Sequence, residues 1–200
     1  MSEATIVSMR RLFRGAILAA LFGLAAACAS NNLAVMTVSQ ANSELATGYL
    51  IDAGDKLKVT VFDEEPLTGE YDVGMGGAIS LPLLEPIMVK NMNPRQVAQV
   101  IEEKLSAGGY VLYPRVSVDI LEYRPFFILG EVAAPGAYPH GGELTLEQAV
   151  AKAGGFTPRA QKSSVVLKRQ DWAESKLIKL GKAALKVAPG DTIIVQEAFF

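Results

Sequence analysis

Short runs of alternating apolar and polar residues recur along the chain, and this period of two predicts many short strands. Two further segments have apolar residues at helical spacing. Each of these segments begins with a capping residue, Asn93 or Thr145, followed three positions later by Gln, and each ends at a pair of glycines. The pattern therefore predicts an α+β fold with two helices. The predicted strands are 56–62, 71–73, 79–82, 87–89, 115–122, 126–129, 165–167, 176–180 and 192–195.

The sequence Gly54-Asp55 is echoed late in the chain by Gly190-Asp191, and both pairs stand directly before a predicted strand. Gly-Asp favours a turn, so the echo predicts two related β-rich units rather than a tandem repeat. The four residues 74–77 predict a hairpin turn between strands 71–73 and 79–82. In all, the structural turns are predicted at Gly54, Asp55, Gly130, Pro135, Gly136, Gly154, Gly155, Gly190 and Asp191. A type II turn at Pro135-Gly136 would give Gly136 a positive φ.

The first 27 residues have the features of a secretory signal peptide, with an arginine cluster, the uncharged apolar run 17–27 and a small-residue end. As a helix, residues 15–27 would reach about 20 Å, which is short for a hydrocarbon core of about 30 Å. The run ends in Ala26-Ala27-Cys28, which resembles the lipobox of bacterial lipoproteins. We expect Cys28 to carry lipid; a small buried cysteine in an ordinary signal peptide is the alternative. Residues 28–48 are then predicted to be a lipidated tether.

The composition excludes several classes of function but does not identify the function. The chain has 200 residues, a net charge of −2, one cysteine and one histidine. Because the chain has no basic excess, we expect no nucleic-acid binding, and a single cysteine excludes a disulfide framework or a CxxC site. We expect His140 to be an exposed loop residue rather than a catalytic base.

Other candidate chemistry is equally sparse. The acidic run 63–65, taken with Asp52 or Asp55, could supply glycosidase carboxylates or cation ligands, but a solvated loop is the simpler interpretation. Trp172 and Tyr123 could stack on sugar rings, although isolated aromatics more often pack in a core or an interface. We predict no catalytic residues, no cofactor and no metal, and hence no enzyme.

From Tyr49 to about Val195 the order of motifs resembles the bacterial polysaccharide export protein family. In the first unit the resemblance rests on residues 49–62 (YLIDAGDKLKVTVF), 67–73 (LTGEYDV), 79–83 (ISLPL) and 114–118 (PRVSV). In the second it rests on residues 127–138 (FILGEVAAPGAY) and 149–156 (AVAKAGGF), which look like a soluble-ligand-binding β-grasp (SLBB) domain. It implies an export domain at 49–123, a mixed sheet with one helix, and an SLBB-type β-grasp domain at 124–200.

The resemblance implies transport rather than catalysis. The protein would be an outer membrane lipoprotein facing the periplasm that exports capsular polysaccharide or exopolysaccharide as a homo-oligomeric ring. Its partners would be the polysaccharide substrate and an inner membrane co-polymerase or chain-length regulator. A periplasmic lipoprotein adaptor that binds a soluble glycan or partner without forming a conduit is the alternative.

Some family members end in a long amphipathic helix that crosses the outer membrane, whereas here nine residues follow Asp191. The chain therefore looks like the short form of the family, without the C-terminal membrane helix. No other segment after Cys28 has an apolar run of spanning length. We expect a separate protein to supply the outer membrane pore.

Overall fold

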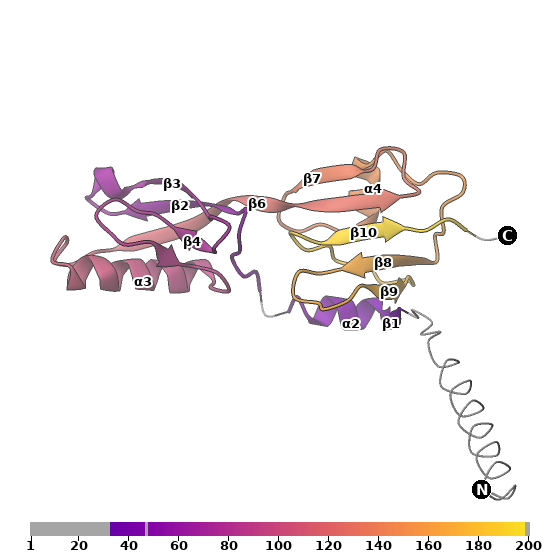
Figure 1. Ribbon diagram of the computed structural model, residues 1–200, viewed down its shortest axis with the longest axis horizontal. Helices are drawn as coiled ribbons and strands as arrows, with labels where there is room; N and C mark the ends of the chain where they lie inside the picture. The colour runs from indigo at the N-terminus through magenta and orange to yellow at the C-terminus, as the bar shows by residue number, and fades with distance from the viewer. Residues whose placement is uncertain (1–32, 47, 199–200) are drawn as a thin grey trace, which may run out of the picture. The chain divides into compact units, whose positions relative to one another are not determined.

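One long strand, β6 (Val116–Gly130), runs through both halves of the fold (Figure 1). The computed structural model describes residues 33–46 and 48–198. The sequence predicted two separate strands here, 115–122 and 126–129, and that separation is wrong. The backbone stays extended between them because the Arg124 N–H donates to Asp55 Oδ1 at 2.9 Å and the Gly190 N–H donates to the Pro125 carbonyl at 3.1 Å. A shift of register between Tyr123 and Phe126 accommodates the join.

The first half, residues 49–123, packs a small sheet on one helix. Strand β2 (Lys56–Val61) pairs antiparallel with both β6 and β3 (Gly69–Asp72), and η1 (Glu65–Leu67) links β2 to β3. The long helix α3 (Pro94–Ala107) begins at Asn93 with the predicted capping box to Gln96. Its buried face joins the inward side chains of β2 and β6 in one cluster that includes Leu57, Val59, Val97, Ile101, Leu105 and Val118.

The predicted hairpin around residues 74–77 is only partly correct. The turn forms, with the Gly77 N–H donating to the Gly74 carbonyl at 2.8 Å and a positive φ at Gly77. The strands on its two sides do not pair with each other, however. Strand β3 pairs with β2, whereas β4 (Ala78–Ile79) pairs with β5 (Ile87–Met88) in a separate two-stranded sheet. Strand β3 pairs with the edge of β2 rather than with β4, because that pairing buries Leu57 and Val59 beneath α3.

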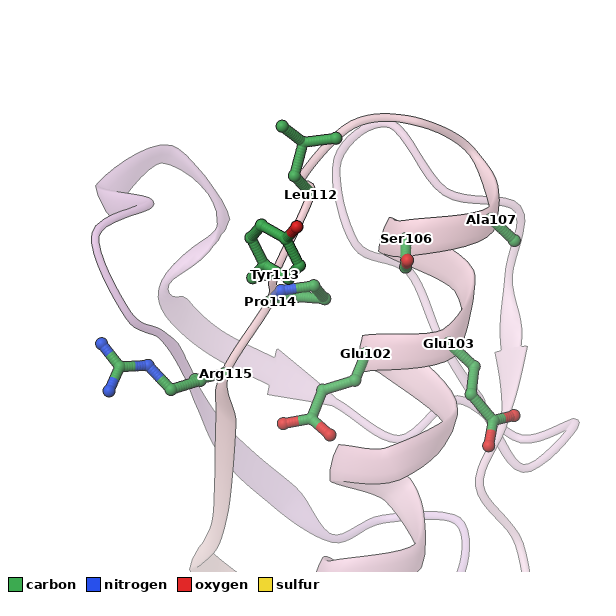
Figure 2. A pocket seen from close by; sticks show the side chains of 8 residues that line it. All are labelled: Glu102, Glu103, Ser106, Ala107, Leu112, Tyr113, Pro114 and Arg115. Carbon is green, nitrogen blue, oxygen red and sulfur yellow. The ribbon is translucent and has the colours of Figure 1, made fainter.

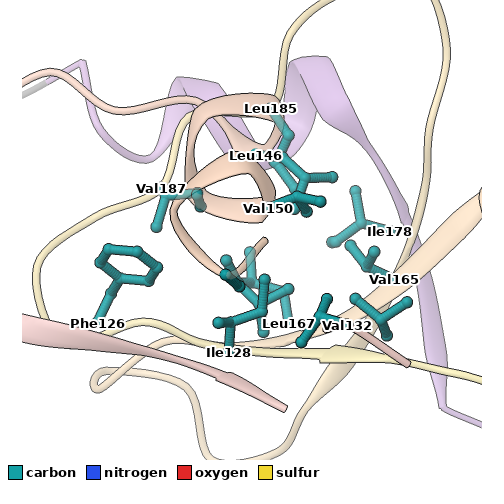
Figure 3. Close-up of a cluster of buried hydrophobic side chains, with 14 of the residues drawn as sticks. Phe126, Ile128, Val132, Leu146, Val150, Val165, Leu167, Ile178, Leu185 and Val187 are labelled. Atoms are coloured by element: carbon teal, nitrogen blue, oxygen red, sulfur yellow. The ribbon is translucent and has the colours of Figure 1, made fainter. Parts of the chain in front are cut away.

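The second half, residues 124–200, is a sheet covered on one face. Strand β10 (Thr192–Val195) lies parallel to β6 and antiparallel to β8 (Ser164–Lys168), β8 pairs with β9 (Lys176–Lys179), and β7 (Gly136–His140) pairs with β6. Helix α4 (Leu146–Lys152) begins at Thr145 with the predicted capping box to Gln148. Figure 3 shows the inward side chains gathered beneath it, including Phe126, Ile128, Leu146, Val150 and Leu167. The predicted α+β fold is confirmed.

The segment predicted as a tether is in part an element of the second half, and the prediction is wrong for those residues. Strand β1 (Ala34–Thr37) pairs parallel with β9, and helix α2 (Val38–Ser43) follows it with a capping box between Thr37 and Gln40. The segment is ordered because Val38 and Ala41 are buried in the same cluster as α4. The predicted signal peptide and Cys28 lie outside the described residues.

Candidate functional site

The two Gly-Asp pairs form the same turn, as the echo in the sequence predicted. Gly54 and Gly190 have φ values of +89° and +84°, and each following aspartate donates its N–H to the carbonyl three residues earlier. Each aspartate also accepts, through Oδ2, the N–H of that same earlier residue, at 2.9 Å for Asp55 and 2.8 Å for Asp191. A positive φ at the third position is the geometry of a type II turn, which glycine adopts without strain.

Asp55 is the centre of a buried polar cluster. The Tyr49 hydroxyl donates to both its carboxylate oxygens at 2.6 Å, and Arg124 donates from its backbone N–H at 2.9 Å and from Nη1 at 3.2 Å. Arg124 Nη1 also donates to the Tyr49 oxygen at 2.6 Å. Burial, reinforced by the hydrogen bond to Asp55, raises the pKa of Tyr49, so this tyrosine stays protonated and remains a donor. The cluster therefore fixes the start of β2 to the middle of β6.

Asp191 is the centre of a second cluster, which binds a different arginine. Arg169 Nε donates to its two oxygens at 3.3 and 3.4 Å, and the other nitrogens of Arg169 donate to the carbonyls of Ala41 and Lys186. Burial raises the pKa of Asp191 to about 6, against the opposing effect of Arg169. Because the Ala41 carbonyl belongs to α2, this cluster attaches the N-terminal helix to the second half.

A hollow of about 330 Å³ opens beside the two turns. Its lining includes Gly54, Gly190, Arg124, Gln170 and Phe127. Gln170 Nε2 donates to Asp52 Oδ2 at 2.6 Å, so the loop after β8 is hydrogen-bonded to the first turn. The polar partners of the two turns, namely Arg124, Arg169, Gln170 and Tyr49, were not predicted from the sequence. The signal for Arg124 was its place as the one cation in the short link between the predicted strands 115–122 and 126–129.

A second, larger hollow of about 830 Å³ lies between the C-terminal part of α3 and the segment that leads into β6 (Figure 2). Glu102 and Glu103 line it from the helix, while Tyr113 and Arg115 line it from the segment. The Glu102 carboxylate accepts the Val116 N–H at 2.8 Å, which fixes the segment to the helix. The exposed Glu103 carboxylate and the exposed Tyr113 can bind hydroxyl-rich ligands. Ser106 also lines this hollow, but among the described residues no hydrogen bond joins it to Glu102 or Glu103 as a nucleophile to a base.

His140 is buried rather than exposed, and the prediction of a loop histidine is wrong. It ends β7, Nε2 lies 2.8 Å from the Val187 carbonyl, and the Gly142 N–H donates to Nδ1 at 3.2 Å. Burial lowers the pKa of His140, and the accepting role of Nδ1 requires the neutral ring. The residue is therefore a structural hydrogen-bonding group of the core, and the sequence missed it because Pro139 and Gly141 suggested a turn.

The remaining candidates contribute packing. The Trp172 indole donates to Glu44 at 2.7 Å, and Tyr123 packs edge-on against Tyr49 with ring centroids 4.9 Å apart. Asp63 and Glu65 are exposed beside the end of β2. Among the described residues, no group of three or more histidines, cysteines or carboxylates is placed to bind a metal ion. Within those residues there is also no helix that is both long enough and apolar enough to cross a membrane.

The other predicted turns differ in outcome. Gly130, Gly154 and Gly155 have positive φ values, and a Cβ on Gly130 would overlap the Val195 carbonyl oxygen of β10. Pro135 stands directly before β7, and Gly136 is the first residue of that strand. The positive φ predicted at Gly136 is wrong, since pairing of Gly136 with Ile128 holds the backbone extended.

Known proteins share both halves of this chain in sequence. The profile of the family described as polysaccharide biosynthesis/export protein matches residues 36–121, and that of the SLBB domain matches residues 125–178. The exopolysaccharide production protein ExoF of Rhizobium meliloti (strain 1021) is 30% identical over 177 residues, covering 83% of this chain and 40% of ExoF. The polysialic acid transport protein KpsD of Escherichia coli is 28% identical over 156 residues, covering 74% of this chain and 28% of KpsD.

The chain thus spans less than half the length of either relative. Both matches nevertheless extend over more than the length of one domain, and the two profiles adjoin within β6, the strand that joins the two halves. With an export domain followed by an SLBB domain, the chain belongs to the polysaccharide export protein family.

Proposed function

We propose that this protein takes part in the export of capsular polysaccharide or exopolysaccharide, as a lipid-anchored outer membrane protein that faces the periplasm. One observation carries the proposal. The export domain and the SLBB domain occur in this order, and similarity to proteins named for exopolysaccharide production and polysialic acid transport extends over most of the chain. The family consists of export proteins, and we propose a transport role without catalysis.

A deletion in the native host tests the transport role. Polymer should disappear from the cell surface and the medium while synthesis continues, so that polysaccharide accumulates inside the envelope. Complementation with the wild-type gene should restore export. A deletion strain that releases normal amounts of polymer would contradict the proposal, and turnover of a glycan by the purified protein would contradict the non-enzymatic role.

We further propose that copies of the chain form a ring around the path of the polymer. The support is physical: each half has a small core of its own, and small domains gain stability from neighbours. The segment after α3 also leaves Leu112 and Tyr113 80% and 90% exposed beside the larger hollow, which suits a subunit contact (Figure 2).

Native mass spectrometry of the purified lipoprotein should then give one multi-subunit species. Replacing both Leu112 and Tyr113 with Ser should weaken the assembly, whereas replacing the exposed Met75 with Ser, as a matched control, should not. A strict monomer at high concentration, also with its inner membrane co-polymerase present, would favour the alternative: an adaptor that binds a soluble glycan or partner without forming a conduit.

The anchor is tested separately. Intact mass of the membrane-extracted protein should show cleavage before Cys28 and added acyl mass, and Cys28→Ser should leave an uncleaved or mislocalised protein. A mature form that starts at another residue would contradict lipidation. The proposed partners are the polysaccharide, the co-polymerase and a separate outer membrane pore protein. The lipidated protein alone in planar bilayers should therefore give no stable conductance, and reproducible channels would contradict the need for a separate pore.

A further inference from the structure

The second half has a sheet face opposite helices α2 and α4, and an apolar row crosses it; the middle member of the row, Val166, is only 6% exposed. Helices α2 and α4 cover the other face, where Ile128, Ile193 and Ile178 are buried. On the open face the register places one apolar residue of each strand beside the next. The row consists of Leu129 on β6, Ile194 on β10, Val166 on β8, Leu177 on β9 and Val35 on β1. We call it the apolar row.

The row is accessible at both ends, where Val35 is 58% exposed and Leu129 is 41% exposed. Phe127, 39% exposed, adds an aromatic ring next to Leu129 on the same face of β6. Single exposed apolar residues are ordinary on protein surfaces, but a contiguous patch across five strands is typical of a surface that contacts a protein or a membrane.

The open face of the first half provides the contrast within the same molecule. There β2 presents Lys56 and Lys58, and Lys56 lies 3.9 Å from both Asp72 of β3 and Glu122 of β6. Lys58 stands opposite Glu70 and Asp119 in the two registers. Charges paired across strands suit a sheet face in contact with water. Strand β6 therefore contributes charged side chains to the open face of the first half and apolar side chains to the open face of the second half.

The charges around the apolar row have one sign. Lys168 and Lys179 share the open face with it, and no acidic residue occurs in strands β1, β8, β9 and β10 or in the part of β6 from Phe127 onward. Across residues 124–200 basic side chains also outnumber acidic ones. An apolar row flanked by lysines is complementary to an anionic phospholipid surface, where apolar side chains enter the acyl boundary and lysines contact the headgroups.

The distance to the proposed anchor supports the same occupant. Five residues separate Cys28 from Ala34, the first residue of β1, so the six Cα–Cα steps between them span at most about 22 Å. Strand β1 carries Val35, the most exposed member of the apolar row. We propose that the open face of the second half lies on an anionic phospholipid surface beside the acylated Cys28. This inference rests on the proposed anchor for its geometry.

A second copy of the chain is the weaker occupant of this face. Self-pairing of the face would place Lys168 and Lys179 of both copies together without acidic partners. Pairing with the open face of the first half would set the apolar row against paired charges. Ring contacts elsewhere on the chain are compatible with a face that lies on lipid.

A single-cysteine probe tests the inference in the acylated protein reconstituted in phosphatidylglycerol-containing vesicles. Because Cys28 is the only cysteine and acylation blocks it, Leu177→Cys offers one reactive thiol for an environment-sensitive fluorophore. Phospholipids with a nitroxide on the acyl chain should quench this probe at least about twofold. The matched control, Lys58→Cys on the open face of the first half, should be unaffected. If Leu177→Cys does not fold, Val35→Cys reports on the same row.

Each possible result of the quenching experiment either supports or overturns the proposed membrane contact. Quenching at residue 177 and not at residue 58 supports the inference. Blue-shifted emission without quenching by the lipid nitroxides would mean that protein covers the face. Emission typical of a probe in water would mean that the face is solvated. Either result would overturn the inference. If wild-type protein takes up the thiol reagent, the anchor has failed, and Leu177→Cys in a Cys28→Ser background, added to the same vesicles, still tests the face.

The lysines give a second, independent readout. Replacing Lys168 and Lys179 with Gln should weaken the contact of the face with anionic lipid. The ratio of quenched to unquenched probe at residue 177, measured from fluorescence lifetimes, should then fall about fivefold per lysine. Lys58→Gln with Lys104→Gln in the first half should leave the ratio unchanged. Equal effects of the two pairs would overturn the role assigned to the face.

Discussion

At both Gly-Asp turns the glycine has a positive φ and the aspartate accepts the N–H of the residue three positions earlier. The tertiary partners differ. Asp55 binds Tyr49 and Arg124, and so links the first half to the middle of β6. Asp191 binds Arg169, which also donates to the Ala41 carbonyl of α2. The same local turn thus holds together two different parts of the molecule.

The comparison separates what a short motif determines from what its surroundings determine. Gly-Asp specifies the backbone, because only glycine adopts the positive φ freely and the aspartate completes the turn. Which parts of the fold the carboxylate links depends on the arginine to which it is hydrogen-bonded, and this arginine comes from a distant part of the chain. Asp55 has two partners besides the turn, whereas Asp191 has one arginine and a raised pKa.

Removing the Asp55 carboxylate should cause the largest loss of stability. In Asp55→Ala the Arg124 guanidinium and the Tyr49 hydroxyl lose their shared acceptor in a buried setting, which costs about 3–5 kcal/mol. Urea denaturation measures the loss. The control is Asp72→Ala, whose side chain is 83% exposed and which should change stability by less than about 0.5 kcal/mol. Similar values for the two variants would contradict the central place of Asp55.

Asp191 should give stability a pH dependence of its own. Its pKa is about 6 when folded against 3.8 for the ordinary group, so the folded state binds the proton more tightly. The contribution of Asp191 to the free energy of unfolding is then greatest below about pH 4, and about 3 kcal/mol of it is lost as the pH rises through 6. In urea titrations from pH 4 to 7, wild type minus Asp191→Asn should fall by about 2 kcal/mol, because the unfolded group is already half ionised at pH 4. A constant difference would contradict the raised pKa.

The two glycines should differ when each is replaced by Ala. Gly54→Ala introduces strain from the positive φ alone, about 1–2 kcal/mol, because the nearest atom to its Cβ, Arg124 Cβ, is at 3.5 Å. Gly190→Ala adds a clash, since its Cβ would lie 2.8 Å from Arg124 Nε, and should cost about 2–3 kcal/mol. Thermal melting compares them. A larger loss at Gly54 would reverse the predicted order.

Much of the fold was predictable because its signals are local. The capping boxes at Asn93 and Thr145 and the two Gly-Asp turns lie within four consecutive residues each, and all of them form. The errors concern elements that depend on distant partners. Helix α2 exists because Val38 and Ala41 are buried against the second half, and β6 is continuous because Asp55 binds Arg124. No local pattern contains those contacts.

The polar clusters illustrate the same limit. The sequence identified Asp55 and Asp191 as turn residues but not Arg124 or Arg169 as their partners, which are 69 and 22 positions away. His140 was placed in a loop because its neighbours are a proline and glycines, yet the Val187 carbonyl, 47 positions away, gives it a buried partner. Charge and turn propensity are read from neighbours, whereas burial is a property of the folded chain.

Gln170 offers the smallest test of the link between the turns. Its amide donates to Asp52 Oδ2, while Oδ1 of the same carboxylate still accepts the Ala53 N–H at 2.7 Å and lies 3.1 Å from Lys90. Gln170→Ala should therefore cost only about 1 kcal/mol, a fall in Tm of about 2–4 °C. The control is Gln99→Ala, which removes an exposed contact to Glu103 within α3 and should cost less than about 0.5 kcal/mol. If the two variants melt together, the hydrogen bond from the loop after β8 to Asp52 contributes no measurable stability to the first turn, and the link between the turns has no energetic weight.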